Sequence, residues 1–522
     1  MKKIEKIVQY HEQSKHSPSR YAASLGYMDW STQPDPFREY IGSSKTDMKL
    51  PTDDDKPTYG ELFNSNIAPS NITLDTLSTF FRYSLGLAAI KNYGGSSWAL
   101  RCNASSGNLH PTEAYALLPQ IEGVSKSSSI VHYAPKNHSL ELLQTLDQEF
   151  PMSGGFYVIL SSIAWREVWK YGERAFRYCQ LDVGHAYRAM QISAKMVGWT
   201  TKMLYSFSDD RLEEMIGLNL KERFYQNENE HADLILFVST QDALENDLNI
   251  KDFSKIGHID SIANRLSSSH HDWPIVESMY ELCKKGEQKE FFEEEKRVEK
   301  SSDQNSARLI LQRRSAQNMN PNDRMMRRED FFQIISGVSY KLEGMDREAH
   351  VSLLCYVHTV EELERGLYII IRDEKHYEIL KSQCDETFEW LTITNDQEVL
   401  LYRLKAGDFQ YFSKASSCNQ DIASEGSFAI SMLSEFEDIL HKKGGWYYRY
   451  LYYECGQIGQ QLYLDATANG YSATGIGCFL DDVIHQMIGL KSKKFQVLYN
   501  FTIGKAITDR RIETTLFSKK SV

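Results

Sequence analysis

Short apolar runs of strand length alternate with longer segments of helical periodicity along most of the chain. Apolar and small residues recur at helical spacing between Leu181 and Met196, and again between Tyr453 and Ala468. The strand-like runs are 114–118, 129–133 and 234–238 in the first half, and 350–357, 366–371 and 497–503 in the second. The pattern predicts an α+β protein with two similar halves.

One segment is repeated at a constant offset without a gap. Residues 170–218 align with residues 442–490, so that Gly198 matches Gly470. Each copy predicts a helix, a turn, a strand or loop, and a second helix, with the glycine in the left-handed conformation that ends a helix. The acidic pairs predicted to cap the second helix are Asp209-Asp210 and Asp481-Asp482. Retention of glycines and acids together indicates an internal duplication.

The predicted organisation has four parts. An N-terminal extension covers 1–70, a first domain 71–245, a charged connector 246–305 and a second domain 306–522. Within the connector, the Lys- and Glu-rich residues 284–300 predict a solvated helix.

Charge and cysteine usage narrow the function classes. The net charge of −12 argues against a general nucleic-acid binder and gives no attraction to an anionic membrane. No apolar run has the length of a bilayer span, and the start lacks the apolar core of a secretory signal. The 8 cysteines are scattered, which indicates reduced, mostly buried thiols in a cytoplasmic protein. No metal site is predicted, because the histidines lack ligand spacing.

Residues 101–115 carry the most informative motif, Arg-Cys-Asn-Ala-Ser-Ser-Gly-Asn-Leu-His-Pro-Thr-Glu-Ala-Tyr. Small hydroxyls, a glycine and an amide can bring hydrogen-bonding groups close to a flat polar ligand, or can simply form a turn before a strand. The motif resembles the flavin-contacting segment of nitroreductase-fold dehydrogenases, above all the SagB-like enzymes that oxidise azoline rings in modified peptides. The resemblance implies FMN contacts from Ser105, Ser106 and Asn108.

The second half opens with Ile-Leu-Gln-Arg-Arg-Ser-Ala-Gln at 310–317. This resembles the Arg-Arg/His-Ser-x-Arg/Lys signature that holds the flavin phosphate, and a forked guanidinium with a hydroxyl suits a phosphate dianion. An ordinary basic helix is the alternative. The resemblance implies cofactor contacts from Arg313, Ser315 and Gln317, although Gln317 lacks the charge of the family residue. Arg510 and Arg511 fall where the family often has a last phosphate-binding base.

Gly475, Ile476 and Gly477 form a glycine loop that the first half lacks, since Met203 and Tyr205 replace the two glycines there. In the resembled fold this loop runs against the isoalloxazine ring, with a backbone N–H near flavin N5. Glycine permits that close approach, whereas a tyrosine would fill the space. The sequence therefore predicts an open loop in the second domain and a filled one in the first.

The two halves have lost complementary motifs. Nitroreductase-fold proteins are typically homodimers with flavins at the interface, and this chain resembles such a dimer fused in tandem. The resemblance implies two nitroreductase-like domains, each a mostly antiparallel sheet flanked by helices, in an intramolecular pseudo-dimer. One composite site would join the serine–asparagine segment of the first domain to the arginine–serine segment and glycine loop of the second, with one FMN per chain.

Lys170 and Tyr171 begin a segment similar to the Lys-Tyr-Gly-x-Arg-x-x-Arg-Tyr of SagB-like dehydrogenases, where the pair is tied to catalysis. Dehydrogenation removes a hydride, which flavin N5 accepts, and a proton, which needs a base. Lys170 can serve if burial and Arg174 lower its pKa, and Tyr171 can serve as a phenolate. His110 is expected to position its loop.

The resulting prediction is an FMN-dependent oxidoreductase of the SagB-like type. Its substrate is a small molecule or modified peptide, its partners are other enzymes of a peptide-modification pathway, and neither nucleic acid nor membrane is a partner. One alternative is an NAD(P)H-dependent reductase of nitro compounds or quinones. The other is a degenerate flavin-fold scaffold in a biosynthetic complex, which Gln317 and Tyr205 favour.

Overall fold

The computed structural model describes residues 2–146, 154–240, 259–290, 299–344, 348–394 and 399–514. The chain divides into two compact units. The first unit comprises Ser24–Phe292, Asp303–Leu311 and Arg511–Val522, and the second comprises Met1–Ala23, Glu293–Ser302 and Gln312–Arg510.

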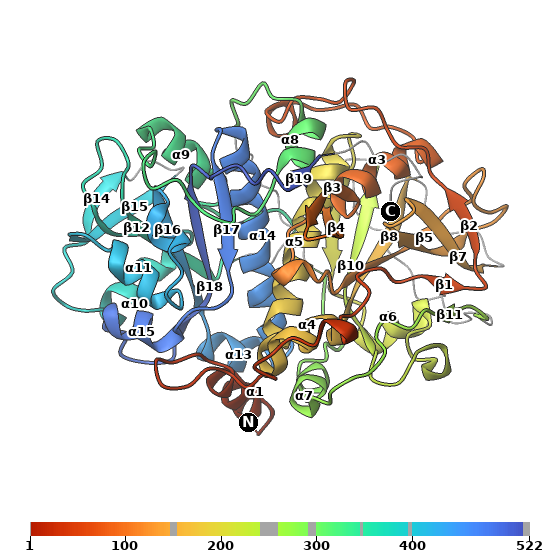
Figure 1. The fold of residues 1–522 in the computed structure, drawn as a ribbon, viewed down its shortest axis with the longest axis horizontal. Coiled ribbons are helices and arrows are strands. Elements are labelled where there is room, and N and C mark those ends of the chain that lie inside the picture. Colours follow the sequence, from red (N-terminus) through yellow and green to blue (C-terminus); the bar gives the residue numbers. More distant parts are fainter. Residues whose placement is uncertain are drawn as a thin grey trace. The chain divides into compact units, whose positions relative to one another are not determined.

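The first unit is built on a seven-stranded antiparallel sheet of order β2-β7-β6-β5-β8-β10-β9 (Figure 1). Every residue of β5, β6, β8 and β10 is buried, which explains why these strands are near-continuous apolar runs in the sequence. The strands are β2 (Ser44–Asp47), β5 (Thr112–Leu118), β6 (Ser129–Ala134), β7 (Ser139–Thr145), β8 (Gly155–Ile163), β9 (Thr200–Leu204) and β10 (Glu230–Ser239).

The second unit repeats this sheet with seven antiparallel strands in the order β14-β15-β13-β12-β16-β18-β17. Six strands of the two sheets match in order and connectivity, so the duplication extends well beyond the aligned helical segment. The edge strand differs, because β2 precedes the other strands of its sheet in the sequence, whereas β14 lies between β13 and β15. The strands are β12 (Val351–Val357), β13 (Gly366–Ile371), β14 (Leu391–Thr394), β15 (Leu400–Ala406), β16 (Phe428–Glu435), β17 (Ser472–Ile476) and β18 (Phe495–Gly504). All six predicted strand runs are confirmed.

A long buried helix accompanies each sheet, α5 (Ala175–Lys195) in the first unit and α14 (Tyr447–Ala468) in the second. In the first unit α5 contacts α3 (Leu74–Ser84) and α4 (Ala164–Tyr171), and in the second α14 contacts α9 (Arg328–Ser336) and α13 (Glu437–Lys443). Both helices are followed by the predicted left-handed glycines, Gly198 with φ of 73° and Gly470 with φ of 74°.

The acidic pairs do not cap the next helices, so that prediction is wrong. Ser208 caps α6 (Asp209–Ile216) with its side chain, and Leu480 occupies the cap position of α15 (Asp481–Met487). Asp209 and Asp481 instead lie in the first turns and accept hydrogen bonds from other segments of their own units, since the backbone N–H of Lys285 donates to Asp209 and that of His16 to Asp481.

The predicted extension and connector both hold regular structure. In the second unit α1 (Lys2–Gln13) buries Ile4 and Ile7 and contacts α13. In the first unit β1 (Tyr40–Ile41) pairs with β11 (Ile262–Ala263), and α7 (Pro274–Leu282) contacts α5. The helix predicted over 284–300 is wrong for 284–290, which has no regular structure, while 246–258 and 291–298 lie outside the described residues.

The remaining helices are η1 (Trp30–Thr32), α2 (Glu61–Asn64), η2 (Ser106–Asn108), η3 (Gly172–Arg174), η4 (Lys221–Arg223), α8 (Ser306–Gln312), α10 (Lys375–Gln383), α11 (Gln410–Ser416) and α12 (Ile422–Glu425). The remaining strands are β3 (Leu87–Tyr93), β4 (Ser96–Arg101) and β19 (Ile512–Glu513), which form a small sheet of order β19-β3-β4.

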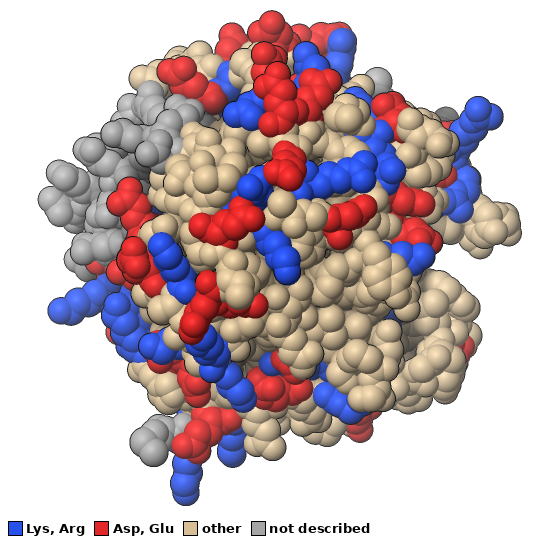
Figure 2. Space-filling view, turned by 90° about the vertical axis from the view of Figure 1, so that its left-hand side faces the viewer, with Lys and Arg blue, Asp and Glu red and all other residues tan. Residues whose placement is uncertain are grey.

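Figure 2 shows Lys and Arg side chains interspersed with Asp and Glu side chains over one face of the molecule, together with a broad area of uncharged residues. The described part of this face therefore carries no continuous basic surface of the kind that attracts nucleic acid. None of the helices in the described ranges combines the length and the apolar character that crossing a bilayer requires.

Candidate active site

The predicted flavin-contacting segment forms a tight turn in the first unit, between β4 and β5. Gly107, Asn108 and His110 have positive φ values of 59°, 60° and 50°. The Asn108 side chain donates to the Ala99 carbonyl over 3.0 Å and contacts the His110 ring through Oδ1, also over 3.0 Å. His110 therefore positions the loop, as the sequence predicts.

A buried acid, Asp182 on α5, holds the two serines of this turn. Its carboxyl group accepts hydrogen bonds from the Ser106 backbone N–H at 3.0 Å and from the Ser106 hydroxyl at 2.9 Å. The Ser105 hydroxyl is a further partner of Asp182 and accepts a hydrogen bond from the His110 N–H at 2.8 Å. Asp182 is 1% exposed, so the turn is attached to the central helix by a carboxyl group that water does not reach.

The environment of Asp182 differs from that of its counterpart in the repeat, Glu454. Glu454 pairs with the Arg372 guanidinium and accepts from the His350 N–H. The hydrogen-bond partners of Asp182 within the described residues are the neutral donors Ser105 and Ser106. Burial therefore dominates and raises the pKa of Asp182 to about 7, although the serine donors oppose the shift. This acid exchanges its proton near neutral pH.

Asp182→Asn should remove part of the pH dependence of stability. Because folding raises the pKa of Asp182 from near 4 to about 7, its contribution to stability is fully present below about pH 4 and is lost as pH rises toward 7. The wild type should lose free energy of unfolding over that range with a slope of up to about 1.4 kcal/mol per pH unit, and Asp182→Asn less. Denaturant unfolding at several pH values measures this, with the exposed Asp272→Asn as control. Parallel curves for wild type and Asp182→Asn would contradict the assignment.

Lys170 and Tyr171, the predicted catalytic pair, lie against the same turn. A Cβ atom built on Gly107 would stand 2.6 Å from the Tyr171 hydroxyl and 3.1 Å from the Lys170 Nζ, so both polar atoms converge on the glycine. The pair comes from the last residues of α4, and Lys170 Nζ is 5.1 Å from the centre of the Tyr171 ring. The Tyr178 ring packs on Tyr171 with centroids 4.4 Å apart. A side chain at position 107 would push the ends of Lys170 and Tyr171 aside, and the positive φ there also favours glycine.

A second buried acid, Glu167, lies one helical turn before Lys170 on α4. It is fully buried, and its carboxyl oxygens have no hydrogen-bond partner among the described residues. Burial raises its pKa well above the usual range, and the nearby charge of Asp182 adds to that shift. Burial likewise lowers the pKa of Lys170, opposed by Glu167. The ionisable neighbour that affects the pKa of Lys170 is thus Glu167, which opposes the shift, and not the predicted Arg174. The site favours an uncharged amine beside a protonated carboxylic acid.

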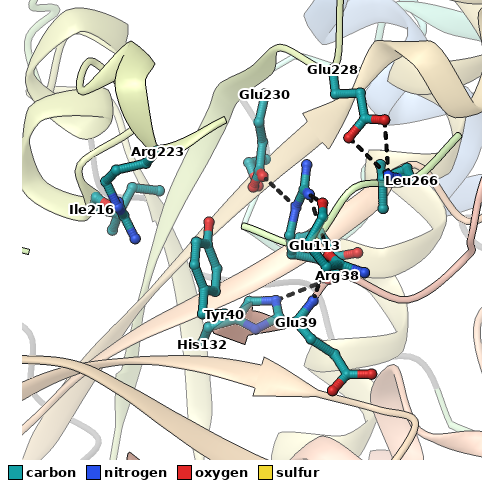
Figure 3. A network of polar contacts seen from close by, with 12 residues as sticks. Arg38, Glu39, Tyr40, Glu113, His132, Ile216, Arg223, Glu228, Glu230 and Leu266 are labelled. Atoms are coloured by element: carbon teal, nitrogen blue, oxygen red, sulfur yellow. Dashed lines mark hydrogen bonds and ion pairs between the residues drawn. The ribbon is translucent and has the colours of Figure 1, made fainter. Parts of the chain in front are cut away.

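The rest of the motif, Glu113 and Tyr115, points away into a buried network rather than into this site. Glu113 pairs with Arg166 and with His132 at 3.1 Å. The Tyr115 hydroxyl donates to Glu230 at 2.6 Å and contacts the Tyr40 hydroxyl, also at 2.6 Å. Figure 3 shows this network around Arg38, Tyr40 and His132. Glu113 and Tyr115 therefore stabilise the fold next to the turn.

In the second unit, the arginine–serine segment runs beside the strand that carries the glycine loop. Ser315 forms a parallel bridge with Ala473, and the Ala316 N–H donates to the Ala473 carbonyl at 3.0 Å. Thr474 Oγ1 donates to the Ala316 carbonyl at 2.7 Å. These contacts fix the segment along β17, whereas the basic-helix alternative fails because α8 ends at Gln312.

Tyr463 on α14 joins the predicted residues of the second unit. Its hydroxyl lies 2.8 Å from Ser315 Oγ and accepts from the Gly475 N–H at 2.8 Å. The Arg313 guanidinium lies 5.1 Å from the centre of its ring. A Cβ atom on Gly475 would also collide with the Tyr499 side chain, so any larger residue there would force Tyr499 to move. Three of the predicted cofactor residues thus meet at one buried phenol.

The other predicted residues have separate surroundings. Ile476 is buried in a small apolar cluster with Ala316 and Met319, while Gln317 and Arg510 are exposed. Arg511 belongs to the first unit, where its guanidinium lies 5.3 Å from the centre of the Tyr93 ring. In the first unit the counterparts of the two loop glycines, Met203 and Tyr205, are both buried. Their side chains are packed inside the unit, and the prediction that they fill the space of a flavin ring stays a prediction.

Sequence reasoning missed Asp182, Glu167 and Tyr463. Asp182 stands opposite Glu454 in the repeat, and a retained acid in a buried helix is a signal that could have drawn attention to it. Tyr463 stands opposite Gln191, and Glu167 precedes the repeated segment, so neither had such a signal. In the described ranges no group of three or more His, Cys, Asp or Glu residues is placed to hold a metal ion.

Comparison with known proteins agrees with the duplicated fold. Residues 70–225 and 310–505 each match the model of the Nitroreductase family. A similar solved structure, described as a putative nitroreductase of Anabaena variabilis, covers 96% of this chain and 99% of its own with a TM-score of 0.68 at 18% identity, which shows a shared fold.

Two curated relatives match shorter segments. The protein named "Putative nitroreductase MJ1384" of Methanocaldococcus jannaschii is 29% identical over 123 residues, 22% of this chain and 61% of that protein. The trifolitoxin-processing protein TfxB of Rhizobium leguminosarum bv. trifolii is 25% identical over 168 residues, 29% of this chain and 44% of TfxB. The chain therefore spans less than two thirds of either relative.

The prediction of two tandem nitroreductase-like domains is confirmed, since the two matched regions correspond to the two halves of the duplication. The two regions together make up well over half of the sequence, and this chain belongs to the nitroreductase family.

Proposed function

We propose that this protein is an FMN-dependent dehydrogenase that oxidises an azoline or another peptide-derived heterocycle. The observation that carries the proposal is the convergence of Lys170 Nζ and Tyr171 Oη on Gly107, within the turn that resembles a flavin-contacting segment. A base and a cofactor-contacting turn side by side suit a reaction that removes a proton and a hydride from one substrate.

When bound, FMN supplies the hydride acceptor, its N5 atom. Lys170 takes the substrate proton as a neutral amine, a form that burial favours. Tyr171, in contact with the same glycine, is the second candidate base or orients the substrate by its hydroxyl. The raised pKa of Glu167 keeps that acid uncharged, and the pKa of Asp182 lies near neutrality. Neither acid therefore holds Lys170 permanently in its charged ammonium form.

The residues of the second unit suit the phosphate of FMN. Arg313 offers a forked donor set, Ser315 offers a hydroxyl, and Tyr463 holds both beside Gly475. Gln317 is exposed and uncharged, so Arg313 carries the charge of this segment. The complementary loss of motifs in the two halves supports one FMN per chain.

The name of TfxB supports a role in peptide modification, since that relative is a trifolitoxin-processing protein. Other enzymes of such a pathway are then the proposed partners, and the proposed substrate is a ring-containing peptide.

The deciding experiment offers the purified, FMN-loaded protein two reactions. A synthetic peptide with one thiazoline, incubated aerobically, should lose two hydrogens, a mass change of about 2 Da. In parallel, NAD(P)H is mixed with the protein under anaerobic conditions. Bleaching of the flavin by NAD(P)H without peptide oxidation would identify a reductase instead, and a protein that stays colourless with added FMN would identify a scaffold.

Arg313→Ala should raise the Kd for FMN at least tenfold, because the loss of a charge-assisted contact to a phosphate is worth about 1.5–3 kcal/mol. The measurement is flavin absorbance after dialysis against a fixed FMN concentration. The control is Arg365→Ala, since Arg365 is 52% exposed in the second unit and pairs with Asp408. Full occupancy in Arg313→Ala would remove this residue from the proposed site.

A further inference from the structure

Two cysteines far apart in the sequence meet in the second unit. Cys418 and Cys478 have their sulfur atoms 2.6 Å apart, with no room for another atom between them. Both are partly exposed, whereas the other six cysteines are buried. The counterpart of Cys478 in the first half is Ser206, so the duplication does not repeat this pair.

The segments that carry these cysteines are fixed to each other independently of the sulfur atoms. The Leu480 N–H donates to the Ser416 carbonyl at 2.7 Å, and the Gln420 side chain donates to the Cys478 carbonyl at 3.2 Å. Cys418 itself has φ of 53°, a left-handed conformation that non-glycine residues adopt only when the surroundings hold them there. The close approach of the sulfurs is therefore built into the fold.

A tyrosine completes the surroundings of the pair. Tyr21 is hydrogen-bonded to Cys418, and the charge of a Cys418 thiolate is the largest cause of the raised pKa of Tyr21. Tyr21 is 53% exposed, so a small reagent can reach this side of the pair. A phenol beside a thiol can donate to the sulfur as negative charge develops on it.

We propose that Cys418 and Cys478 form a reversible disulfide by exchange with a low-molecular-weight disulfide. One cysteine attacks a sulfur of the external disulfide, which releases one external thiol and leaves a mixed disulfide on the protein. The other cysteine then attacks that mixed disulfide and releases the second external thiol. Two protein S–H bonds are replaced by one S–S bond, and the external disulfide is reduced to two thiols.

The disulfide would act on the glycine loop, because Cys478 directly follows Gly477. It would tie the end of this loop to the segment around Cys418, 60 residues away in the sequence. A covalent link of that span stabilises the folded state by limiting the unfolded chain. The proposal concerns the two thiols alone and does not depend on the proposed dehydrogenase activity.

The test treats the reduced full-length protein with oxidised glutathione and measures its intact mass and its thiols. The wild type should lose two thiols and about 2 Da, recover both with reductant, and yield a peptide linking Cys418 to Cys478. Cys418→Ser and Cys478→Ser should each stop at the mixed disulfide and gain the mass of one glutathione less two hydrogens. The matched control Cys384→Ser removes a fully buried thiol and should behave as the wild type.

Two results would overturn the proposal. One is a wild-type protein that accumulates the mixed disulfide without closing the ring. The other is closure that persists in Cys418→Ser or Cys478→Ser, because a different pair would then be responsible.

Discussion

Arg166→Met is expected to lower the free energy of unfolding by about 3–5 kcal/mol, the usual cost of leaving one charge of a buried pair without its partner. Arg166 is fully buried, pairs with Glu113 and donates to the His110 carbonyl at 2.7 Å. Burial would raise the pKa of Glu113, but the charge of Arg166 and the hydrogen bond from His132 hold it at about 2. Without Arg166, a charged Glu113 must stay in the interior or take up a proton.

The measurement is urea unfolding followed by tryptophan fluorescence, since Trp165, Trp169 and Trp199 lie in the first unit. Arg211→Met serves as the control, because it removes a partly exposed partner of Glu214 on α6 and should cost less than about 0.5 kcal/mol. The double variant Arg166→Met with Glu113→Gln should recover part of the loss. A single variant as stable as the control would mean that this network does not support the fold.

Lys170→Met and Tyr171→Phe are expected to leave FMN bound and to lower turnover by about 100- to 10,000-fold for whichever residue is the base. Both polar atoms converge on Gly107, and neither substitution opens a large cavity. Because the pKa of Lys170 is lowered by burial, an amine base predicts that turnover rises with pH through a value below that of an ordinary lysine. If Tyr171 is the base, the rise of turnover with pH should still be seen in Lys170→Met.

The pH profile of kcat separates these cases from a purely structural role. Tyr93→Phe is a suitable control, since it removes a hydroxyl from a tyrosine that is 63% exposed on β3 of the same unit. Unchanged turnover and an unchanged pH profile in both Lys170→Met and Tyr171→Phe would exclude the pair from the chemistry. Loss of bound flavin in Tyr171→Phe would instead give it a cofactor-binding role.

The strands and the central helices could be predicted from the sequence because buried elements appear in it as apolar runs or as apolar residues at helical spacing. β13 covers the same residues as its apolar run, and α14 ends where the periodicity ends. The helix caps were harder. Ser208 and not Asp209 caps α6, because an acid followed by a second acid fits both the cap and the first turn equally well by residue type.

The candidate site was predicted only in part, because its supporting contacts join distant segments. The motif that contains Ser105 and Asn108 marks the turn, but nothing in its spacing shows that Asp182, on the following long helix, holds the serines. Glu113 and Tyr115 belong to the same motif and yet serve the buried network. Tyr463 contacts Ser315 and Gly475, which belong to segments far apart in the sequence, so its position depends on tertiary contacts that no sequence pattern shows.

The ratio of bound flavin to polypeptide in the purified protein tests the central claim most directly. After incubation with excess FMN and removal of the unbound cofactor, the absorbance of released flavin is divided by the chain concentration from amino-acid analysis. One FMN per chain is the predicted result, because each half keeps only part of the motif set. A ratio near two, or a chain that retains none, would contradict it.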